Sequence, residues 1–289
     1  MRKFQLGRTG LDVSAVAFGG FMLFGRTDEE ARTYVDTAIE RGVNYFDVAP
    51  AYGDSQDRLG PALKKYRDDV YLACKTVERT AEGAKAELLN SLKILQTDHF
   101  DVYQLHCLMS PDDVDTVFGK GGAMETLLWA KREGIIRNIG FSTHSEEAGL
   151  AAMKRFDYDT ALFPMNWAIG INDGWGDRTA ALAKEQDVGL IAMKTLAHRL
   201  WLDEAEHESY PNSWTKPITD NDALSIAAIK YGFLKGAATQ TSPGNFGHFC
   251  FMLDHVDACC DQPITDAEWA LLRSEAAKVR DMPIFKAGA

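Results

Sequence analysis

A regular alternation of strand-like and helix-like segments runs along the whole chain and constrains its fold more than any other feature. The segments make about eight strand–helix pairs, at roughly thirty residues a pair, with no Ser/Pro-rich linker between them. This pattern is typical of a (β/α)8 TIM barrel, in which a helix follows each parallel strand. We therefore expect an α/β fold with a single barrel domain over residues 1–289. The alternative is a doubly wound open sheet, which the number of strands disfavours.

Turn residues and hydrophobic periodicity set the boundaries of the expected elements. The expected strands cover residues 11–20, 43–47, 70–75, 100–106, 136–142, 160–165, 188–193 and 237–240. The expected helices cover residues 27–41, 57–66, 80–95, 124–133, 180–186, 223–232 and 249–259, with a further helix from residue 145. Residues 198–219 show no helical period, and we expect a lid or binding loop there. Residues 107–123 are expected to form a second, flexible wall of the same site.

The overall charge limits the range of partners. Lysine and arginine number 31 against 42 aspartate and glutamate residues, which gives a net charge of −11 and a pI near 5.1. Such a chain repels phosphate, so we expect neither nucleic acid nor an anionic membrane as a partner. No apolar run reaches the ~20 residues that span a bilayer, and no signal-peptide h-region is visible. The five cysteines lack metal-ligand spacing, so we expect a reduced, cytoplasmic protein without a bound metal.

Three successive expected strands end in a residue that can carry chemistry. The strands end at Asp47, Lys75 and His106, and Tyr52 follows the first of them in a turn that contains Pro50. In a barrel the carboxyl ends of all strands open onto one face, where active sites are built. The fold would therefore bring these side chains together despite their separation in sequence. Each residue also has a structural interpretation: an ion pair, a satisfied strand-end histidine or a packed loop tyrosine.

The residue types suggest how such a group would work. Tyr52 has an ordinary pKa near 10, and a nearby Lys75 ammonium would lower that pKa by favouring the phenolate. A buried Lys75 needs a counter-charge, which Asp47 can supply. His106 could then donate a hydrogen bond that orients a substrate oxygen.

Several motifs, in this order, resemble the aldo-keto reductase family. They lie at residues 6–11, 42–53, 74–76, 101–106 and 134–142. The resemblance covers nearly the whole chain and implies a barrel that binds a nicotinamide cofactor. It also implies reduction of an aldehyde or ketone, with sugar-like carbonyls among the candidates, to an alcohol, or the reverse reaction. In this reading the partner is a small carbonyl or alcohol, and Asp47, Tyr52, Lys75 and His106 form a catalytic tetrad with Tyr52 as the acid.

The resemblance also implies cofactor contacts near the later strands. The residues so implied are Ser142, Thr143, Asn166, Met193, Lys194, Ser242 and Asn245. Leu162 replaces a glutamine that holds the nicotinamide amide in many members. Thr241 stands where a basic residue usually binds the 2′-phosphate, and no lysine or arginine occurs from 237 to 255. NADP(H) is the usual cofactor of the family and is the one we expect, but without a basic residue there we expect weak discrimination, with NAD(H) possible.

Residues 192–196 resemble the Met-Lys-Pro-Leu segment of one subgroup of the family. That subgroup often carries a ferredoxin-like extension, but no cysteine cluster is present here, so we expect no iron–sulfur centre. An alternative function is a cofactor-binding regulatory subunit with the same fold and little turnover, like the β subunits of potassium channels. Nothing in the sequence resembles a channel-docking extension, which favours the enzyme.

Overall fold

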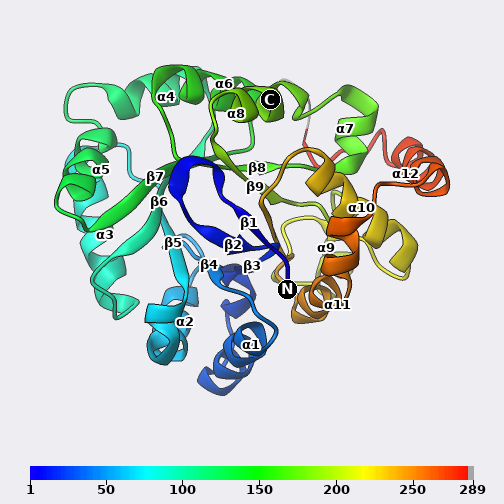
Figure 1. Cartoon of the computed structure of the whole chain (residues 1–289), viewed down its shortest axis with the longest axis horizontal. Coiled ribbons are helices and arrows are strands. Elements are labelled where there is room, and N and C mark those ends of the chain that lie inside the picture. Colours follow the sequence, from blue (N-terminus) through cyan, green and yellow to red (C-terminus); the bar gives the residue numbers. More distant parts are fainter. Residues whose placement is uncertain (286–289) are drawn as a thin grey trace.

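The computed structural model of the chain, which describes residues 1–285, contains a closed barrel of parallel strands surrounded by helices (Figure 1). Neighbouring strands pair in the order β12-β3-β4-β5-β6-β7-β8-β9, with β12 closing against β3. Their bounds are β3 (Val16–Gly19), β4 (Tyr45–Asp47), β5 (Tyr71–Thr76), β6 (Phe100–Leu108), β7 (Ile136–Thr143), β8 (Thr160–Pro164), β9 (Gly189–Met193) and β12 (Thr239–Thr241). The expected TIM barrel is confirmed.

The helices form an outer ring around these strands (Figure 1). Those close to the expected positions are α1 (Asp28–Glu40), α2 (Ser55–Leu63), α3 (Ala81–Ile94), α5 (Ala123–Arg132), α6 (Glu146–Arg155), α8 (Asp177–Glu185), α10 (Asp222–Leu234) and α11 (Phe246–Asp261). Helices that were not expected are α4 (Pro111–Phe118), α7 (Trp167–Asp173), α9 (Glu204–His207) and α12 (Asp266–Lys278). The wall expected at 107–123 contains α4 in its centre, and the flexibility of this segment stays a prediction.

The helix starts follow local capping chemistry. Thr27 and Glu30 form a reciprocal capping box at the start of α1, and Thr265 and Glu268 form another at the start of α12. Each cap satisfies backbone N–H groups that have no partner within the helix and stabilises it by about 1 kcal/mol.

A small hairpin closes the amino-terminal end of the barrel. The expected strand at 11–20 is in fact two strands, because β2 (Asp12–Ser14) pairs antiparallel with β1 (Lys3–Gln5) and only β3 enters the barrel. The buried side chains of Leu6, Leu11 and Val13 pack against residues inside the barrel. The opposite, carboxyl end of the barrel is thus the one left for a site.

The strand register decides which side chains face the barrel interior. Successive residues of a strand point to opposite faces, so Tyr45 and Asp47 share one face, as do Ala73 and Lys75. Tyr45 and Ala73 belong to the cluster inside the barrel, and Asp47 pairs in register with Ala73. The last acid of β4 and the lysine of β5 therefore both point inward.

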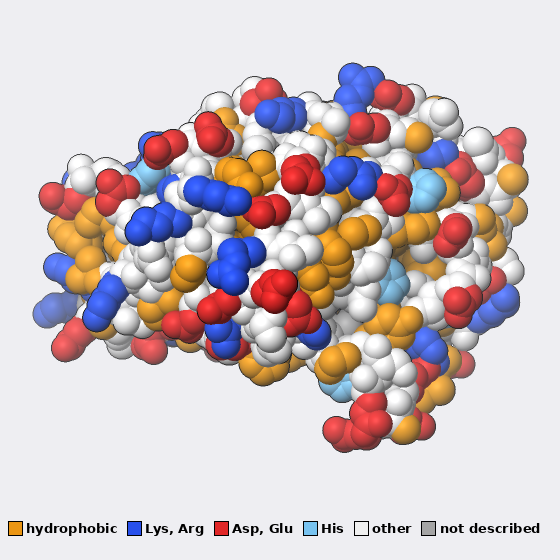
Figure 2. Space-filling model, turned by 90° about the horizontal axis from the view of Figure 1, so that it is seen from below, with side chains coloured by type: hydrophobic (Ala, Val, Ile, Leu, Met, Phe, Trp, Pro, Cys, Tyr) orange, Lys and Arg blue, Asp and Glu red, His pale blue; other side chains and the backbone are white. Residues whose placement is uncertain are grey.

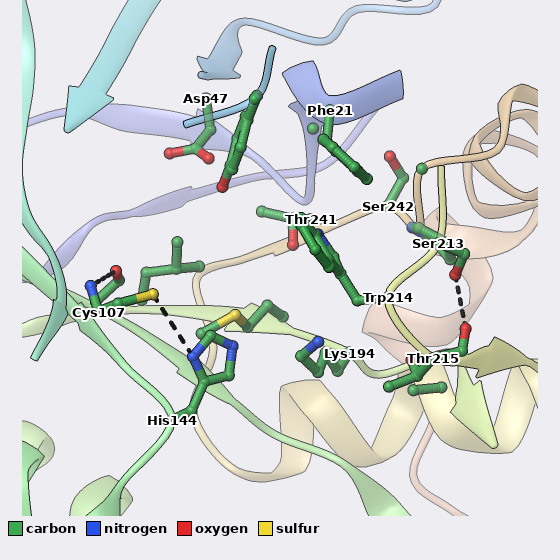
Figure 3. A pocket seen from close by; sticks show the side chains of 18 of the residues that line it. Phe21, Asp47, Cys107, His144, Lys194, Ser213, Trp214, Thr215, Thr241 and Ser242 are labelled. Carbon is green, nitrogen blue, oxygen red and sulfur yellow. Dashed lines mark hydrogen bonds between the residues drawn. The ribbon is translucent and has the colours of Figure 1, made fainter. Parts of the chain in front are cut away.

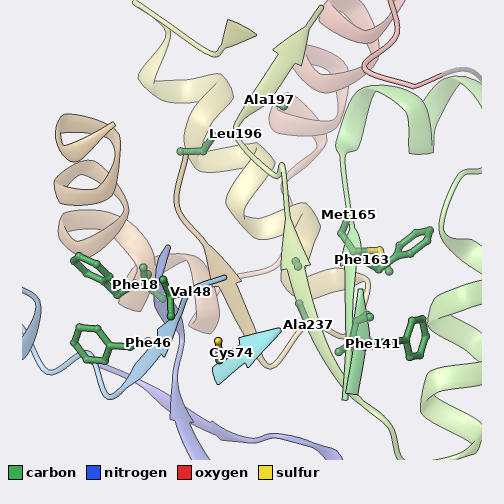
Figure 4. Close-up of a cluster of buried hydrophobic side chains, with 14 of the residues drawn as sticks. Phe18, Phe46, Val48, Cys74, Phe141, Phe163, Met165, Leu196, Ala197 and Ala237 are labelled. Carbon is green, nitrogen blue, oxygen red and sulfur yellow. The ribbon is translucent and has the colours of Figure 1, made fainter. Parts of the chain in front are cut away.

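The intervening residues face the helices. The rings of Phe18 and Phe46 lie 5.1 Å apart between neighbouring strands, and Phe249 of α11 meets Phe18 edge-on at 5.5 Å. Figure 4 shows this part of the cluster, with Phe141 and Phe163 in another part of it. The core thus lies mainly between the barrel and its helices, which fixes the strand ends rigidly.

Acidic and basic side chains are interspersed on the face shown in Figure 2. This face shows no continuous basic stripe of the kind that binds nucleic acid. Within residues 1–285, no helix is both long and apolar enough to cross a bilayer.

Candidate active site

A cavity of about 610 Å³ lies at the carboxyl ends of the barrel strands (Figure 3). Its size falls in the range of small-molecule sites, ~300–1,000 Å³. Asp47, Tyr52 and His106 line one part of it, and Met193 and Ser242 line another. The barrel therefore brings three of the four expected catalytic residues to the cavity wall, and Lys75 lies directly behind them.

Lys75 and Asp47 form a buried ion pair. The Nζ atom of Lys75 lies 2.5 Å from Oδ2 of Asp47 and also donates to the carbonyl oxygen of Val48 at 3.2 Å. Burial raises the pKa of Asp47, and Lys75 opposes that shift. Burial alone would lower the pKa of Lys75, but the charge and the hydrogen bond of Asp47, together with nearby Tyr52 and Cys74, outweigh it and hold that pKa above its ordinary value. The expected counter-charge is therefore present.

Tyr52 lies over this pair in the turn after β4. The Nζ atom of Lys75 is 4.9 Å from the centroid of the Tyr52 ring, and the rings of Tyr52 and His106 are 5.8 Å apart and nearly perpendicular. The turn depends on Gly53, whose φ is +58° and where a Cβ would lie 2.3 Å from the ring of Phe24. Only glycine satisfies both conditions easily.

The expectation that Tyr52 has a lowered pKa was wrong. Burial raises the pKa of Tyr52 above its ordinary value, and Lys75 offsets only part of this. The physical reason is that Asp47 already neutralises most of the ammonium charge, so the cost of desolvating a phenolate prevails. Tyr52 therefore holds its proton at neutral pH.

His106 is a neutral imidazole at the end of the interior face of β6. Burial, reinforced by the nearby charge of Lys75, lowers the pKa of His106 to about 3. Among the residues that the structure describes, its buried Nδ1 atom has no hydrogen-bond partner. A neutral ring beside Tyr52 can offer an N–H to an oxygen in the cavity without adding charge.

An irregularity in β6 turns the residue after His106 into the cavity as well. The register of β6 against β7 shifts between Leu105 and Leu108, and Cys107 has a φ of +54°. The N–H of Cys107 donates to Oγ of Ser142 at 2.9 Å instead of to a strand partner. Bulges commonly re-aim a side chain in this way.

Arg79, in the loop after β5, holds the carboxyl end of β6 in place. The guanidinium of Arg79 donates to the carbonyl oxygens of His106 and Cys107, each at 2.9 Å, and pairs with Asp113 of α4. Arg79 therefore fixes the backbone that carries two cavity residues. It is a positioning residue that lies outside the cavity lining.

The residues expected to contact a cofactor divide into two groups. Ser142, Met193, Lys194 and Ser242 line the cavity. The others have structural roles: Thr143 donates to Leu108, Asn166 caps α7 and Asn245 caps α11. A cofactor contact for these three stays a prediction without support from the geometry of the cavity.

The segment 198–219 contains more secondary structure than expected. It contains α9, and its ends form a hairpin of β10 (Ala197–Arg199) with β11 (Lys216–Pro217). We call residues 210–217 the strap, because several of them line the cavity.

The strap is fastened on both sides of the barrel mouth. Trp214 stacks on Phe21 with ring centroids 4.8 Å apart, and the amide of Asn212 donates to the carbonyl oxygen of Phe24 at 2.8 Å. On the other side, a Cβ on Gly244 would lie 1.5 Å from the carbonyl oxygen of Asn212. Residue 244 must therefore be a glycine for the strap to pass this close to it.

Sequence reasoning did not single out His144 or Phe285 among the cavity residues, and it included Cys107 only as the first residue of the expected wall at 107–123. Cys107 and His144 lie with Sγ and Nδ1 3.8 Å apart, and the Phe285 ring lies 5.0 Å from that of His144. The position of Cys107 next to His106 was a usable signal, but strand alternation places it outside the barrel. Phe285 comes from the far end of the chain, and no local pattern indicates it.

With this fold and site in place, comparison with known proteins identifies the class. The model of the Aldo/keto reductase family matches residues 15–242. The chain belongs to this family and is an oxidoreductase.

Individual relatives agree with this assignment. The chain is 36% identical over 232 residues to the uncharacterized oxidoreductase YqkF of Bacillus subtilis, covering 74% of this chain and 72% of YqkF. It is 30% identical over 248 residues to L-galactose dehydrogenase of Arabidopsis thaliana, covering 80% and 75% of the two chains. The solved holo form of an aldo-keto reductase from Bacillus halodurans shares the fold, with a TM-score of 0.72 at 23% identity over 100% of this chain and 98% of that one.

Proposed function

We propose that this chain reduces aldehydes or ketones to alcohols with a nicotinamide cofactor, using Asp47, Tyr52, Lys75 and His106 as its catalytic group. The observation that carries the proposal is the placement of a protonated Tyr52 at the cavity wall, between the Lys75–Asp47 pair and a neutral His106. Carbonyl reduction needs a proton donor and a hydrogen-bond donor at one oxygen, and this wall supplies both.

The cavity residues fit a nicotinamide dinucleotide. Figure 3 shows Cys107 and Ser242 on opposite sides of the cavity, and the hydroxyl of Ser142 lies beside Cys107. Among residues 1–285 the sulfur of Met22, at 3.5 Å, is the one hydrogen-bond partner of the Ser242 hydroxyl, which can therefore also bind a ligand. The amino terminus of α11 follows shortly after Ser242, and such a terminus favours phosphate.

In this assignment Ser142 would hold the nicotinamide amide, Met193 would pack on its ring, and Ser242 would meet the adenosine phosphate. The bound cofactor supplies the hydride.

The chain's own residues handle the proton. Tyr52 donates its hydroxyl proton to the oxygen that becomes the alcohol, and a ring N–H of His106 stabilises the charge that develops on that oxygen. A raised pKa does not prevent Tyr52 from acting, because an alkoxide is far more basic than a phenolate. Lys75 limits the cost of the transient phenolate until solvent returns the proton.

A panel of aldehydes, ketones and sugars tests the proposal by the loss of NADPH or NADH absorbance. We expect turnover of 4-nitrobenzaldehyde and near-complete loss of it in Tyr52→Phe. Tight cofactor binding with no turnover across the whole panel would refute the proposal and favour the regulatory-subunit alternative.

A further inference from the structure

The backbone at Lys194 is held in an unusual conformation. Lys194 follows β9 with a φ of +62°, a left-handed value that is uncommon for a lysine. The side-chain amide of Asn166 donates to the carbonyl oxygens of Lys194 and Ala197, at 3.0 and 2.7 Å. Asn166 thus fixes the direction in which the Lys194 side chain leaves the barrel.

That direction leads into the cavity. Within residues 1–285 the Nζ atom of Lys194 has neither a hydrogen-bond nor an ion-pair partner, and it lies 5.3 Å from the centroid of the Phe285 ring. Burial lowers the pKa of Lys194 to about 8. The group remains mostly protonated at pH 7, and an anion would relieve the cost of burying it.

The rest of the cavity makes this charge stand out. Among the lining residues that belong to positions 1–285, only Asp47 and Lys194 carry full charges, and Asp47 is already paired with Lys75. Val77, Met109, Phe21 and Trp214 make much of the remaining wall apolar. In the described part of the chain, the cavity therefore has a largely apolar wall and one cation without a counter-charge.

The position of Lys194 relates it to the substrate side of the site. Burial raises the pKa of the Cys107 thiol, which directly follows His106, and the charge of Lys194 opposes that shift. Burial lowers the pKa of His144, and the charge of Lys194 lowers it further. Figure 3 shows Lys194 close to His144, across the cavity from Asp47. A ligand whose carbonyl meets Tyr52 could thus place a second group near Lys194.

We propose that Lys194 determines substrate specificity by binding a carboxylate, so that the preferred substrates carry a carboxylate separated from the carbonyl by an apolar spacer. This inference rests on the proposed function and adds a substrate class to it. The cofactor's phosphates are the competing anion, and the experiment below separates the two.

The test compares two aldehydes that differ in charge, 4-carboxybenzaldehyde and methyl 4-formylbenzoate. The variants are Lys194→Met, which keeps the length without the charge, and Lys194→Arg, which restores it. Lys184→Met is the control, because Lys184 is exposed on α8 and its loss changes the net charge equally. We expect Lys194→Met to raise KM for the acid about 10- to 100-fold and to change kcat/KM for the ester less than about threefold.

Two further readouts distinguish the possible failures. NADPH affinity, from protein fluorescence, should stay within about threefold of wild type in Lys194→Met. A tenfold loss there would assign Lys194 to the cofactor and overturn the proposal, as would equal losses for the acid and the ester.

Binding of 4-(hydroxymethyl)benzoate, measured by calorimetry with and without NADPH, does not depend on turnover. If binding depends on Lys194 but no aldehyde is reduced, the proposed function fails and the carboxylate site stands. Binding that is absent, or equal in wild type and Lys194→Met, overturns the site itself.

Discussion

The ammonium group of Lys75 lies 2.5 Å from the carboxylate of Asp47, inside the barrel and behind the cavity wall. This pairing limits what Lys75 can do for Tyr52, because a neutralised cation exerts a weaker field. It also makes the two residues a unit whose members cannot be removed independently. The predictions below test the unit and the residues around it.

Tyr52→Phe removes only the hydroxyl group and keeps the packing against Phe21 and His106. We expect kcat to fall by at least about a hundredfold while the NADPH dissociation constant stays nearly unchanged. Single-turnover reduction of 4-nitrobenzaldehyde measures the chemical step directly. A variant that retains more than about a tenth of the wild-type rate would exclude Tyr52 as the acid.

Lys75→Met should destabilise the protein as well as inactivate it. The substitution leaves the carboxylate of Asp47 buried without a partner, which costs about 3–5 kcal/mol of unfolding free energy. The double variant Asp47→Asn/Lys75→Met should recover most of that loss, because no charge is left buried. Urea unfolding of the four proteins in the cycle gives the coupling energy, and additive effects would show that the pair contributes little.

The pH dependence of reduction follows from the shifts at Tyr52 and His106. Because burial raises the pKa of Tyr52 and lowers that of His106 to about 3, neither group changes its charge between pH 6 and 9. We therefore expect kcat/KM for methyl 4-formylbenzoate to be flat across this range. Oxidation of the matching alcohol needs the phenolate and should rise with pH. A break in the reduction profile near pH 7 would contradict this assignment.

Discrimination between NADPH and NADH should be weak. Thr241 stands where a basic residue is expected, and Lys235, a distant candidate, pairs with Asp177 on the surface. We expect the two dissociation constants to differ by less than about a hundredfold, or ~2.7 kcal/mol. Fluorescence titrations at one ionic strength measure both. A thousandfold preference for NADPH would require a basic group that binds the 2′-phosphate.

Gly244→Ala should loosen the strap. The added methyl group cannot fit against the carbonyl oxygen of Asn212, so one of the two backbones must move. We expect cofactor affinity to fall about tenfold, with little change in thermal stability, because residues 210–217 lie outside both hydrophobic core clusters of the described chain. Asn212→Ala, which removes the bond to Phe24, should act in the same direction. Unchanged affinity in both variants would show that the strap does not retain ligands.

The sequence was enough to predict the barrel, because the hydrophobic periods of strands and helices differ clearly. The inward direction of the Asp47 and Lys75 side chains follows from the alternation of side chains along a strand. The missed helices carried usable signals. Ser110 and Pro111 mark the start of α4, and Thr265 opens a capping box for α12. Both helices lie outside the eight strand–helix pairs of the barrel pattern, so that pattern alone does not predict them.

Other features of the site depend on long-range contacts. The interpretation of Asn166 as a cofactor contact hid its role as the cap of α7 and the anchor of Lys194. The raised pKa of Tyr52 depends on how completely Asp47 neutralises Lys75, which needs a distance. The approach of Phe285 to the cavity depends on the path of the whole chain.

The strap adds a kinetic consequence to its structural one. Trp214 and Asn212 fasten it through contacts within the protein that involve no ligand. If a ligand under the strap leaves only when the strap opens, the frequency of opening is a property of the chain and limits the rate of release. Carbonyl compounds of very different reactivity should therefore approach one common maximal turnover rate, set by the opening of the strap.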